Sequence, residues 1–138
     1  MSISQISVFV ESQPGHMKNV LDTLASAGVS VRGYCAADTG DYGIVRFVVD
    51  NPVAGLSALT NAGFAAKLTD ILCIELVDTP GELGRILGII ADAGINIMYS
   101  YSLVSTYIAI QTDGDLQRAE QLLAQTDLKL VNNNDLHL

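Results

Sequence analysis

The fold of this chain is decided by residues 71–97, which read ILCIELVDTPGELGRILGIIADAGINI. The stretch starts as an apolar strand, turns at residues 79–82 and continues as an amphipathic helix, because its apolar residues recur at i, i+3, i+4 and i+7. The residues on this helix face are Leu83, Ile86, Leu87 and Ile90. Gly94 predicts a left-handed stop, so a second strand is expected from Ile95.

The corner between this strand and helix, Thr79-Pro80-Gly81-Glu82, has the pattern of a capping box. Thr79 is expected to accept a hydrogen bond from the helix start and Glu82 to reach back, with Pro80 in the first turn. The first N–H groups of a helix have no internal partner and carry the positive end of its dipole, and Gly81 leaves room beside them. The corner is therefore either a site for a small carboxylate or phosphate, or simply a stable helix start.

The same pattern occurs twice in the chain, at a spacing of 66 residues. Pro14-Gly15 corresponds to Pro80-Gly81, and the apolar and glycine positions that follow also correspond. The matched pairs include Val20 and Ile86, Leu21 and Leu87, Leu24 and Ile90, Gly28 and Gly94, and Val31 and Ile97. Later in each copy the spacing falls to 63, where Leu59 matches Leu122. A shorter hairpin is therefore expected in the second copy, because loops absorb such deletions.

Each copy is expected to contain a strand, a helix, a two-stranded hairpin, a helix and a closing strand. In the first copy these are residues 5–11, 14–27, 29–37, 42–49, a helix capped by Asn51, and 64–68. The turn of its hairpin is predicted at Thr39-Gly40-Asp41. In the second copy the elements are residues 71–77, 81–93, 95–103, 106–112, 115–125 and 128–131. Both copies therefore have the order βαββαβ.

This order predicts an α+β fold of two ferredoxin-like repeats, each with four antiparallel strands and two helices on one face. The boundary falls at the short link Thr69-Asp70, which gives repeats at residues 1–69 and 70–138 that pack as one body. The edge strands that start at Val29 and Ile95 are the expected partners, and their pairing would join the antiparallel sheets side by side into an eight-stranded sheet.

Composition narrows the classes of partner. The chain has 138 residues, 49% of them hydrophobic, and a formal net charge of −8, so neither nucleic acid nor an anionic membrane is an expected partner. No 18-residue apolar run or signal-peptide pattern is present, which favours a cytoplasmic location.

No metal motif is present, so no metal or cofactor is expected. Cys35 and Cys73 are interpreted as buried apolar groups, with a disulfide left open for an oxidising compartment, and His137 as a solvated tail residue.

The two quoted patterns resemble ACT domains. The second copy, DTPGELGRILGIIADAGINI at residues 78–97, is the closer match, and the first, SQPGHMKNVLDTLASAGVSV at residues 12–31, is looser. Because the resemblance covers nearly the whole chain, it implies a free-standing tandem ACT protein. ACT modules bind small effectors, commonly amino acids, at the interface of paired domains and regulate a partner enzyme.

The resemblance also implies the ligand-binding residues. The strand-end position two residues before Pro-Gly falls on Ser12 and Asp78. The polar position of the Ile-Asn-Ile run falls on Ser30 and Asn96. With the neighbouring corner residues, the candidate ligand site comprises Ser12, Gln13, Gly15, Ser30, Asp78, Thr79, Gly81, Asn96 and Ile97. Asp78 would repel a ligand carboxylate but could pair with an α-ammonium group, and the alternative for this residue is helix capping. For Asn96 the alternative is a hydrogen bond to a turn.

The leading hypothesis is a non-catalytic regulatory module, a homodimer that binds an amino acid at the interface of its two repeats and modulates a metabolic enzyme. One rival is an interaction subunit without a ligand, for which an acyl-CoA ligase is a candidate partner. The other rival is an acylphosphatase-like enzyme, which is disfavoured because neither corner contains an arginine and no nucleophile–base pair occurs at catalytic spacing. Further candidates for pocket or strand contacts are Arg32, Tyr34, Tyr99 and Tyr101. Arg46 is expected to reach the open face of the sheet and a partner carboxylate, and His16 is expected to be solvated. The ligand and the partner enzyme are left open.

Overall fold

The computed structural model of the protein describes residues 2–38, 40 and 42–136. The turn residues Thr39 and Asp41 and the tail residue His137 lie outside the described residues. The chain divides into two compact units, here called the N-terminal unit (mainly Ser4–Thr69) and the C-terminal unit (mainly Asp70–Asp135). Within the described ranges, no helix is long and apolar enough to cross a membrane.

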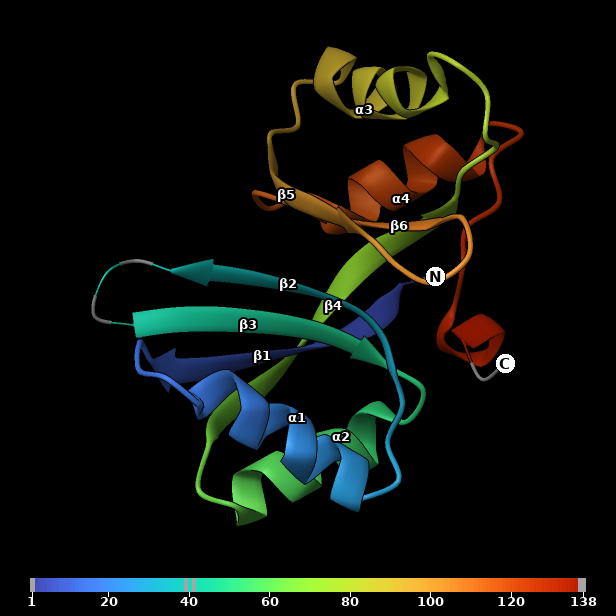
Figure 1. Ribbon diagram of the computed structural model, residues 1–138. Helices are drawn as coiled ribbons and strands as arrows, with labels where there is room; N and C mark the ends of the chain where they lie inside the picture. Colours follow the sequence, from blue (N-terminus) through green and yellow to red (C-terminus); the bar gives the residue numbers. More distant parts are fainter. Residues whose placement is uncertain (1, 39, 41, 137–138) are drawn as a thin grey trace. The chain divides into compact units, whose positions relative to one another are not determined.

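The N-terminal unit has the predicted βαββαβ order (Figure 1). Its elements are β1 (Ile3–Glu11), α1 (His16–Ser26), β2 (Val31–Asp38), β3 (Tyr42–Val49), α2 (Pro52–Asn61) and the first part of β4 (Ala65–Glu75). The strand order is β2-β3-β1-β4, and both β1 and β2 are antiparallel to β3. The Ala54 N–H donates to the side chain of Asn51 (3.2 Å), so Asn51 caps α2 as its sequence predicts.

The C-terminal unit repeats this order as far as its second helix, starting from the second part of β4. Its other elements are α3 (Glu82–Asp92), β5 (Ile97–Ser102), β6 (Tyr107–Thr112), α4 (Leu116–Ala124) and a 3-10 helix, η1 (Asn133–Leu136). The strand order is β4-β6-β5, with β6 antiparallel to both neighbours. In each unit the two helices contact each other and lie on one face of the strands (Figure 1). The prediction of two ferredoxin-like repeats is therefore confirmed.

The closing strands differ from the prediction. Residues 64–68 and 71–77, predicted as two strands, belong largely to one strand, β4, because Thr69-Asp70 contains no glycine or proline and continues in the extended conformation. The predicted strand 128–131 is reduced to a bridge between Leu130 and β4. The described part of the chain therefore has six named strands where the sequence predicted eight.

The predicted joining of the repeats is also corrected. Among the described strands, β2 pairs with β3 and β5 pairs with β6, so the strands expected to start at Val29 and Ile95 are not partners within the chain. The repeats are instead connected through β4, whose first residues belong to the N-terminal unit and whose last residues belong to the C-terminal unit.

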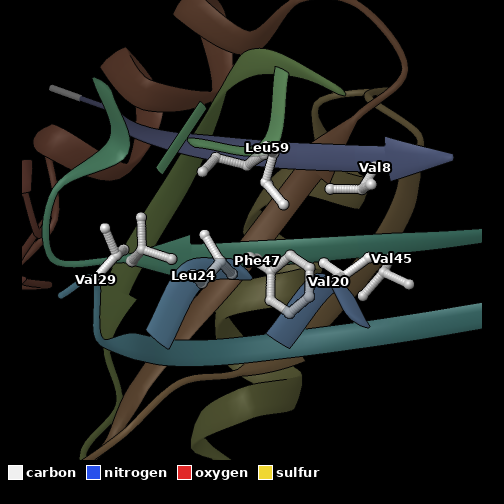
Figure 2. Packing of buried hydrophobic residues seen from close by; sticks show 9 residues of the cluster. Val8, Val20, Leu24, Val29, Val45, Phe47 and Leu59 are labelled. Carbon is white, nitrogen blue, oxygen red and sulfur yellow. The ribbon is translucent and has the colours of Figure 1, made fainter. Parts of the chain in front are cut away.

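Each unit has its own hydrophobic core. In the N-terminal unit Phe47 of β3 is fully buried, and Figure 2 shows apolar side chains of α1 and the strands gathered around its ring. This cluster comprises Ile6, Val8, Val20, Leu24, Val29, Val45, Phe47, Val49 and Leu59. The cluster of the C-terminal unit comprises Leu72, Ile74, Ile86, Ile90, Ile95, Ile108, Ile110, Ala119 and Leu123. On the predicted apolar face of α3, Ile86 and Ile90 are buried, whereas Leu83 in the first turn is 40% exposed.

Packing against this core explains a glycine within α2. A Cβ atom at Gly55 would lie 2.9 Å from Ile6 Cδ1 and 3.5 Å from side-chain atoms of Leu24 and Val49. Gly55→Val is therefore expected to lower the free energy of unfolding by about 1–3 kcal/mol, because it overpacks the core. Gly84→Val in α3 is the matched control: nothing lies within 4 Å of a Cβ there, and a change within about 0.5 kcal/mol is expected. Equal losses for both variants in urea unfolding would contradict the packing explanation.

Candidate functional site

In the N-terminal unit, β1 passes into α1 through a type II turn, and residues 12–16 are here called the first corner. The His16 N–H donates to the Gln13 carbonyl (3.3 Å), with Pro14 and Gly15 at the two central positions. Gly15 has φ 86° and ψ −12°, the left-handed conformation that this turn requires at its third position. Since proline pre-sets the second position, the Pro-Gly sequence specifies the turn.

The C-terminal unit has the same turn, and residues 78–82 are called the second corner. The Glu82 N–H donates to the Thr79 carbonyl (3.2 Å), and Gly81 has φ 86° and ψ −8°. The predicted capping box is therefore wrong: the cap residue of α3 is Gly81, without a side-chain hydrogen bond, and neither Thr79 nor Asp78 caps the helix. The physical reason is that the turn is completed before α3 starts, which leaves Thr79 outside the helix.

The helix that follows each corner offers backbone donors. In α1 the first helical hydrogen bond joins the Asn19 N–H to the Gly15 carbonyl (3.0 Å), and the N–H groups of Met17 and Lys18 have no acceptor among the described residues. In α3 the corresponding first bond comes from the Arg85 N–H (3.0 Å). Such N–H groups lie at the positive end of the helix dipole and favour an anion.

A hollow of about 390 Å³ adjoins the first corner. The polar residues that line it, here called the rim, are residues 11–13 and His16, and the other lining residues, here called the walls, are mostly apolar. The wall residues are Val10, Pro14, Met17, Ala36, Ala37, Gly43 and Val45, contributed by β1, the corner, α1, β2 and β3. Space is available here because Ala36, Ala37 and Gly43 have small side chains or none. The hollow lies within one unit and could hold a molecule the size of an amino acid.

His16 stands at the edge of this hollow and is half-buried. Its Nδ1 lies 2.9 Å from the Glu11 carbonyl oxygen, which can only accept, so Nδ1–H donates and the neutral ring keeps Nε2 as an acceptor. The sequence predicted a first-turn residue here, and His16 is the first residue of α1; that it also borders the hollow was not predicted. The signal that was missed is the difference between the copies, because the matching position in the second copy is Glu82.

The second corner is surrounded by charged side chains. Arg85 forms an ion pair with Glu82, and its Nη2 atom lies 3.4 Å from Asp127 Oδ1. Lys129 Nζ lies 3.8 Å from Glu75 Oε2. The hydrogen bond that Arg85 Nε donates to the Glu82 carboxylate raises the pKa of Arg85. These residues line a smaller hollow of about 220 Å³. The described residues contain no group of three or more histidine, cysteine, aspartate or glutamate side chains able to share a metal ion.

Within the N-terminal unit, the structure brings together only some of the predicted ligand-binding residues. Ser12 and Gln13 line the hollow, and Gly15 forms the turn beside it. Ser30 lies at the far end of the sheet, beyond the last residue of β3, where its carbonyl accepts from the Asp50 N–H (3.1 Å). Glu11, next to the corner, pairs with Tyr42, the first residue of β3. At about 3.3 Å per residue the two ends are about 25 Å apart, so one ligand cannot touch both.

The C-terminal unit separates its predicted residues in the same way. Asp78, Thr79 and Gly81 are at the second corner, near the start of β6, because the Leu76 N–H donates to the Thr106 carbonyl (2.7 Å). The other two predicted residues lie at the far end of β6. There the Asn96 carbonyl accepts from the Asp113 N–H (2.8 Å), and Ile97 is opposite Thr112.

The remaining candidates make structural contacts. Arg32 Nε donates to the Leu136 carbonyl (3.0 Å). The ring of Tyr34 packs against Phe47, and the rings of Tyr99 and Tyr101 are stacked, with centroids 6.3 Å apart in each pair. The tyrosine rings therefore contribute to packing on the strands, whereas Arg32 of β2 contacts η1. Arg46 lies on β3, opposite Ser7 of β1 and Cys35 of β2.

A comparison with known protein families identifies the chain. The model of the ACT domain pair matches residues 1–138. The chain belongs to the ACT domain pair family. The resemblance inferred from the Pro-Gly corners and their repetition is thereby confirmed. No curated protein matches this ACT pair.

Several solved structures share the fold of this ACT pair. Protein BT0572 from Bacteroides thetaiotaomicron is 28% identical, with a TM-score of 0.91, over 99% of this chain and 96% of that chain. The regulatory subunit of aspartate kinase from Thermus thermophilus, in its ligand-free form, is 21% identical, with a TM-score of 0.63, over 90% of this chain and 91% of that chain. The corresponding subunit from Thermus flavus is 22% identical, with a TM-score of 0.60, over 88% and 90%.

Proposed function

We propose that this ACT pair, built from repeats at residues 1–69 and 70–138, is a non-catalytic regulatory module that binds an amino acid and modulates a partner enzyme. The observation that carries the proposal is the hollow at the first corner, which is lined by Glu11, by Met17 of the first turn of α1 and by mostly apolar residues. The ligand-binding residues of the proposal at this corner are Ser12, Gln13 and Gly15, to which we add Glu11 and His16 because they line the same hollow.

The chemistry of the first corner suits a zwitterion. The ligand carboxylate accepts from the N–H groups of Met17 and Lys18, and the Glu11 carboxylate accepts from the α-ammonium group. Each such charge-assisted hydrogen bond contributes about 1.5–3 kcal/mol when it is sheltered from water. A Kd between about 1 μM and 1 mM requires about −8 to −4 kcal/mol, so two or three of these bonds with side-chain burial suffice.

The second corner is the other candidate site of the proposal, with Asp78, Thr79 and Gly81. Ser30, Asn96 and Ile97 lie too far from the corner of their own unit to reach its ligand. The proposal therefore keeps the expected effector site at the interface of paired ACT repeats, and it includes a homodimer, in which these residues of one chain contact an effector held at a corner of the other chain.

The relatives support the proposal that this chain regulates a separate enzyme. Two proteins that share the fold are described as regulatory subunits of aspartate kinase. A third structure, described as the alpha and beta subunits of aspartokinase, is 18% identical with a TM-score of 0.55. We propose a catalytic chain of amino-acid metabolism as the partner of this ACT pair.

Thermal unfolding in the presence of each amino acid tests this function. An effector at a concentration 100 times its Kd stabilises the folded state by about 2.7 kcal/mol. For a chain of this size we expect the melting temperature to rise by about 5–10 °C with at least one amino acid. If no amino acid at millimolar concentration raises it, while an enzyme co-purifies with the chain, the interaction subunit without a ligand becomes the better explanation.

A further inference from the structure

We infer that the hollow at the first corner selects amino acids with aliphatic side chains, such as valine, leucine, isoleucine and methionine, over acidic and basic ones. The inference rests on the proposed function and adds to it the class of effector. It is carried by the side chains that line the hollow and by their charges.

The walls of the hollow favour an apolar side chain. Val10 and Val45 come from the adjacent strands β1 and β3, Met17 from α1 and Ala36 from β2. Val45 is 2% exposed, so the wall is continuous with the core of the unit. An aliphatic group that enters the hollow leaves water for apolar surroundings, which is favourable in proportion to the area it buries.

Acidic side chains are disfavoured by the charges at the rim. Glu11 is the one carboxylate among the residues that line the hollow in the described chain, and none of these residues is a lysine or an arginine. Lys18 of α1 is paired with Asp22 (2.6 Å), and both side chains are exposed. A second ligand carboxylate would therefore lie near Glu11 without a cation to balance it.

Basic side chains are disfavoured for a different reason. The Glu11 carboxylate is the acceptor for the α-ammonium group, and one of its oxygens, Oε2, already accepts from Gln13 Nε2 (3.2 Å). A second ammonium or guanidinium group would enter the apolar wall, where a charge without a partner is costly.

Small residues set the size of the hollow. Ala36 of β2 lies opposite Val45, and Gly43 of β3 lies opposite Val10. At the matching place in the C-terminal unit, Ser102 lies opposite Ile108. Ala36 and Ser102 are both exposed, so a larger side chain at either position is compatible with the core.

The experiment measures the thermal shift and the Kd for each of the twenty amino acids with three proteins. These are the unmodified chain, Ala36→Leu and Ser102→Leu. We expect an aliphatic amino acid to bind the unmodified chain at least about tenfold more tightly than aspartate, glutamate, lysine or arginine. Ala36→Leu fills the hollow and is expected to raise this Kd about tenfold or more. Ser102→Leu introduces a leucine at the matching position of the C-terminal unit and is expected to leave the Kd unchanged.

The outcomes test the effector class and the proposed regulatory function separately. If a charged amino acid binds most tightly, or if Ala36→Leu keeps the response of the unmodified chain, the inference about the effector class and its position is overturned while the regulatory function stands. If no amino acid binds the unmodified chain, the proposed function fails as well. A loss of response in Ser102→Leu alone would also overturn the inference, since it would place the site in the C-terminal unit.

Discussion

Gly15→Val is expected to abolish the thermal shift caused by the effector and to lower the free energy of unfolding by about 1–3 kcal/mol. Gly15 has a φ of 86°, which a β-branched residue adopts only under strain. A Cβ at this position would meet nothing within 4 Å, so the cost arises from the backbone and not from a clash. Relief of the strain is expected to move the type II turn, and with it the N–H groups of Met17 and Lys18 that we propose as donors to the ligand carboxylate.

The same substitution at the second corner decides between the two candidate sites. Gly81 has nearly the same conformation, with φ 86° and ψ −8°, and equally open surroundings. Gly81→Val is therefore expected to lose a similar amount of stability but to keep the response to the effector. Urea unfolding and thermal shift of both variants measure the two effects. A response lost only in Gly81→Val would move the site to the second corner, and a response kept in both would exclude the corners.

Much of the fold could be predicted from the sequence because its signals are local. The turn at the first corner depends on the adjacent Pro14 and Gly15, and the start of α2 depends on Asn51. Gly28 and Gly94 adopt the left-handed conformation after α1 and α3, with φ of 72° and 77°. The repetition at 66 residues also lets one copy support the interpretation of the other. Element order and helix limits follow from such features.

The hollow could not be predicted, because its walls come together only when the strands pair. Gly43 meets Val10 through the β1–β3 register, and Ala36 meets Val45 through the β2–β3 register. An alanine or a glycine in a strand carries no local sign that it borders an open space. The capping box failed for a related reason, since Thr79 and Glu82 fit the pattern but the turn between them takes the role of the cap.

Cys73 is expected to make the protein lose stability between pH 9 and pH 12. This fully buried side chain lies on β4, and burial raises the pKa of its thiol from 9.0 to about 12, with a further contribution from Asp135 and an opposing hydrogen bond from the Ile74 backbone. Below pH 9 the thiol is protonated in both the folded and the unfolded chain, so its contribution is fully present. Above pH 9 the unfolded chain releases a proton that the folded chain keeps, and the free energy of unfolding falls by about 1.4 kcal/mol per pH unit, or about 4 kcal/mol by pH 12.

Cys73→Ala isolates this effect from the titration of lysines and tyrosines, which is common to both proteins. Urea unfolding, followed by circular dichroism, gives the free energy of unfolding at pH 8 and at pH 10.5. The unmodified chain is expected to lose about 2 kcal/mol more than Cys73→Ala over this interval, because only its thiol is held protonated by burial. The variant is less stable at pH 8, since a small cavity replaces the sulfur opposite Ala109, so the comparison uses the change with pH and not the absolute values. Equal losses in the two proteins would mean that Cys73 ionises in the folded state as readily as in the unfolded chain.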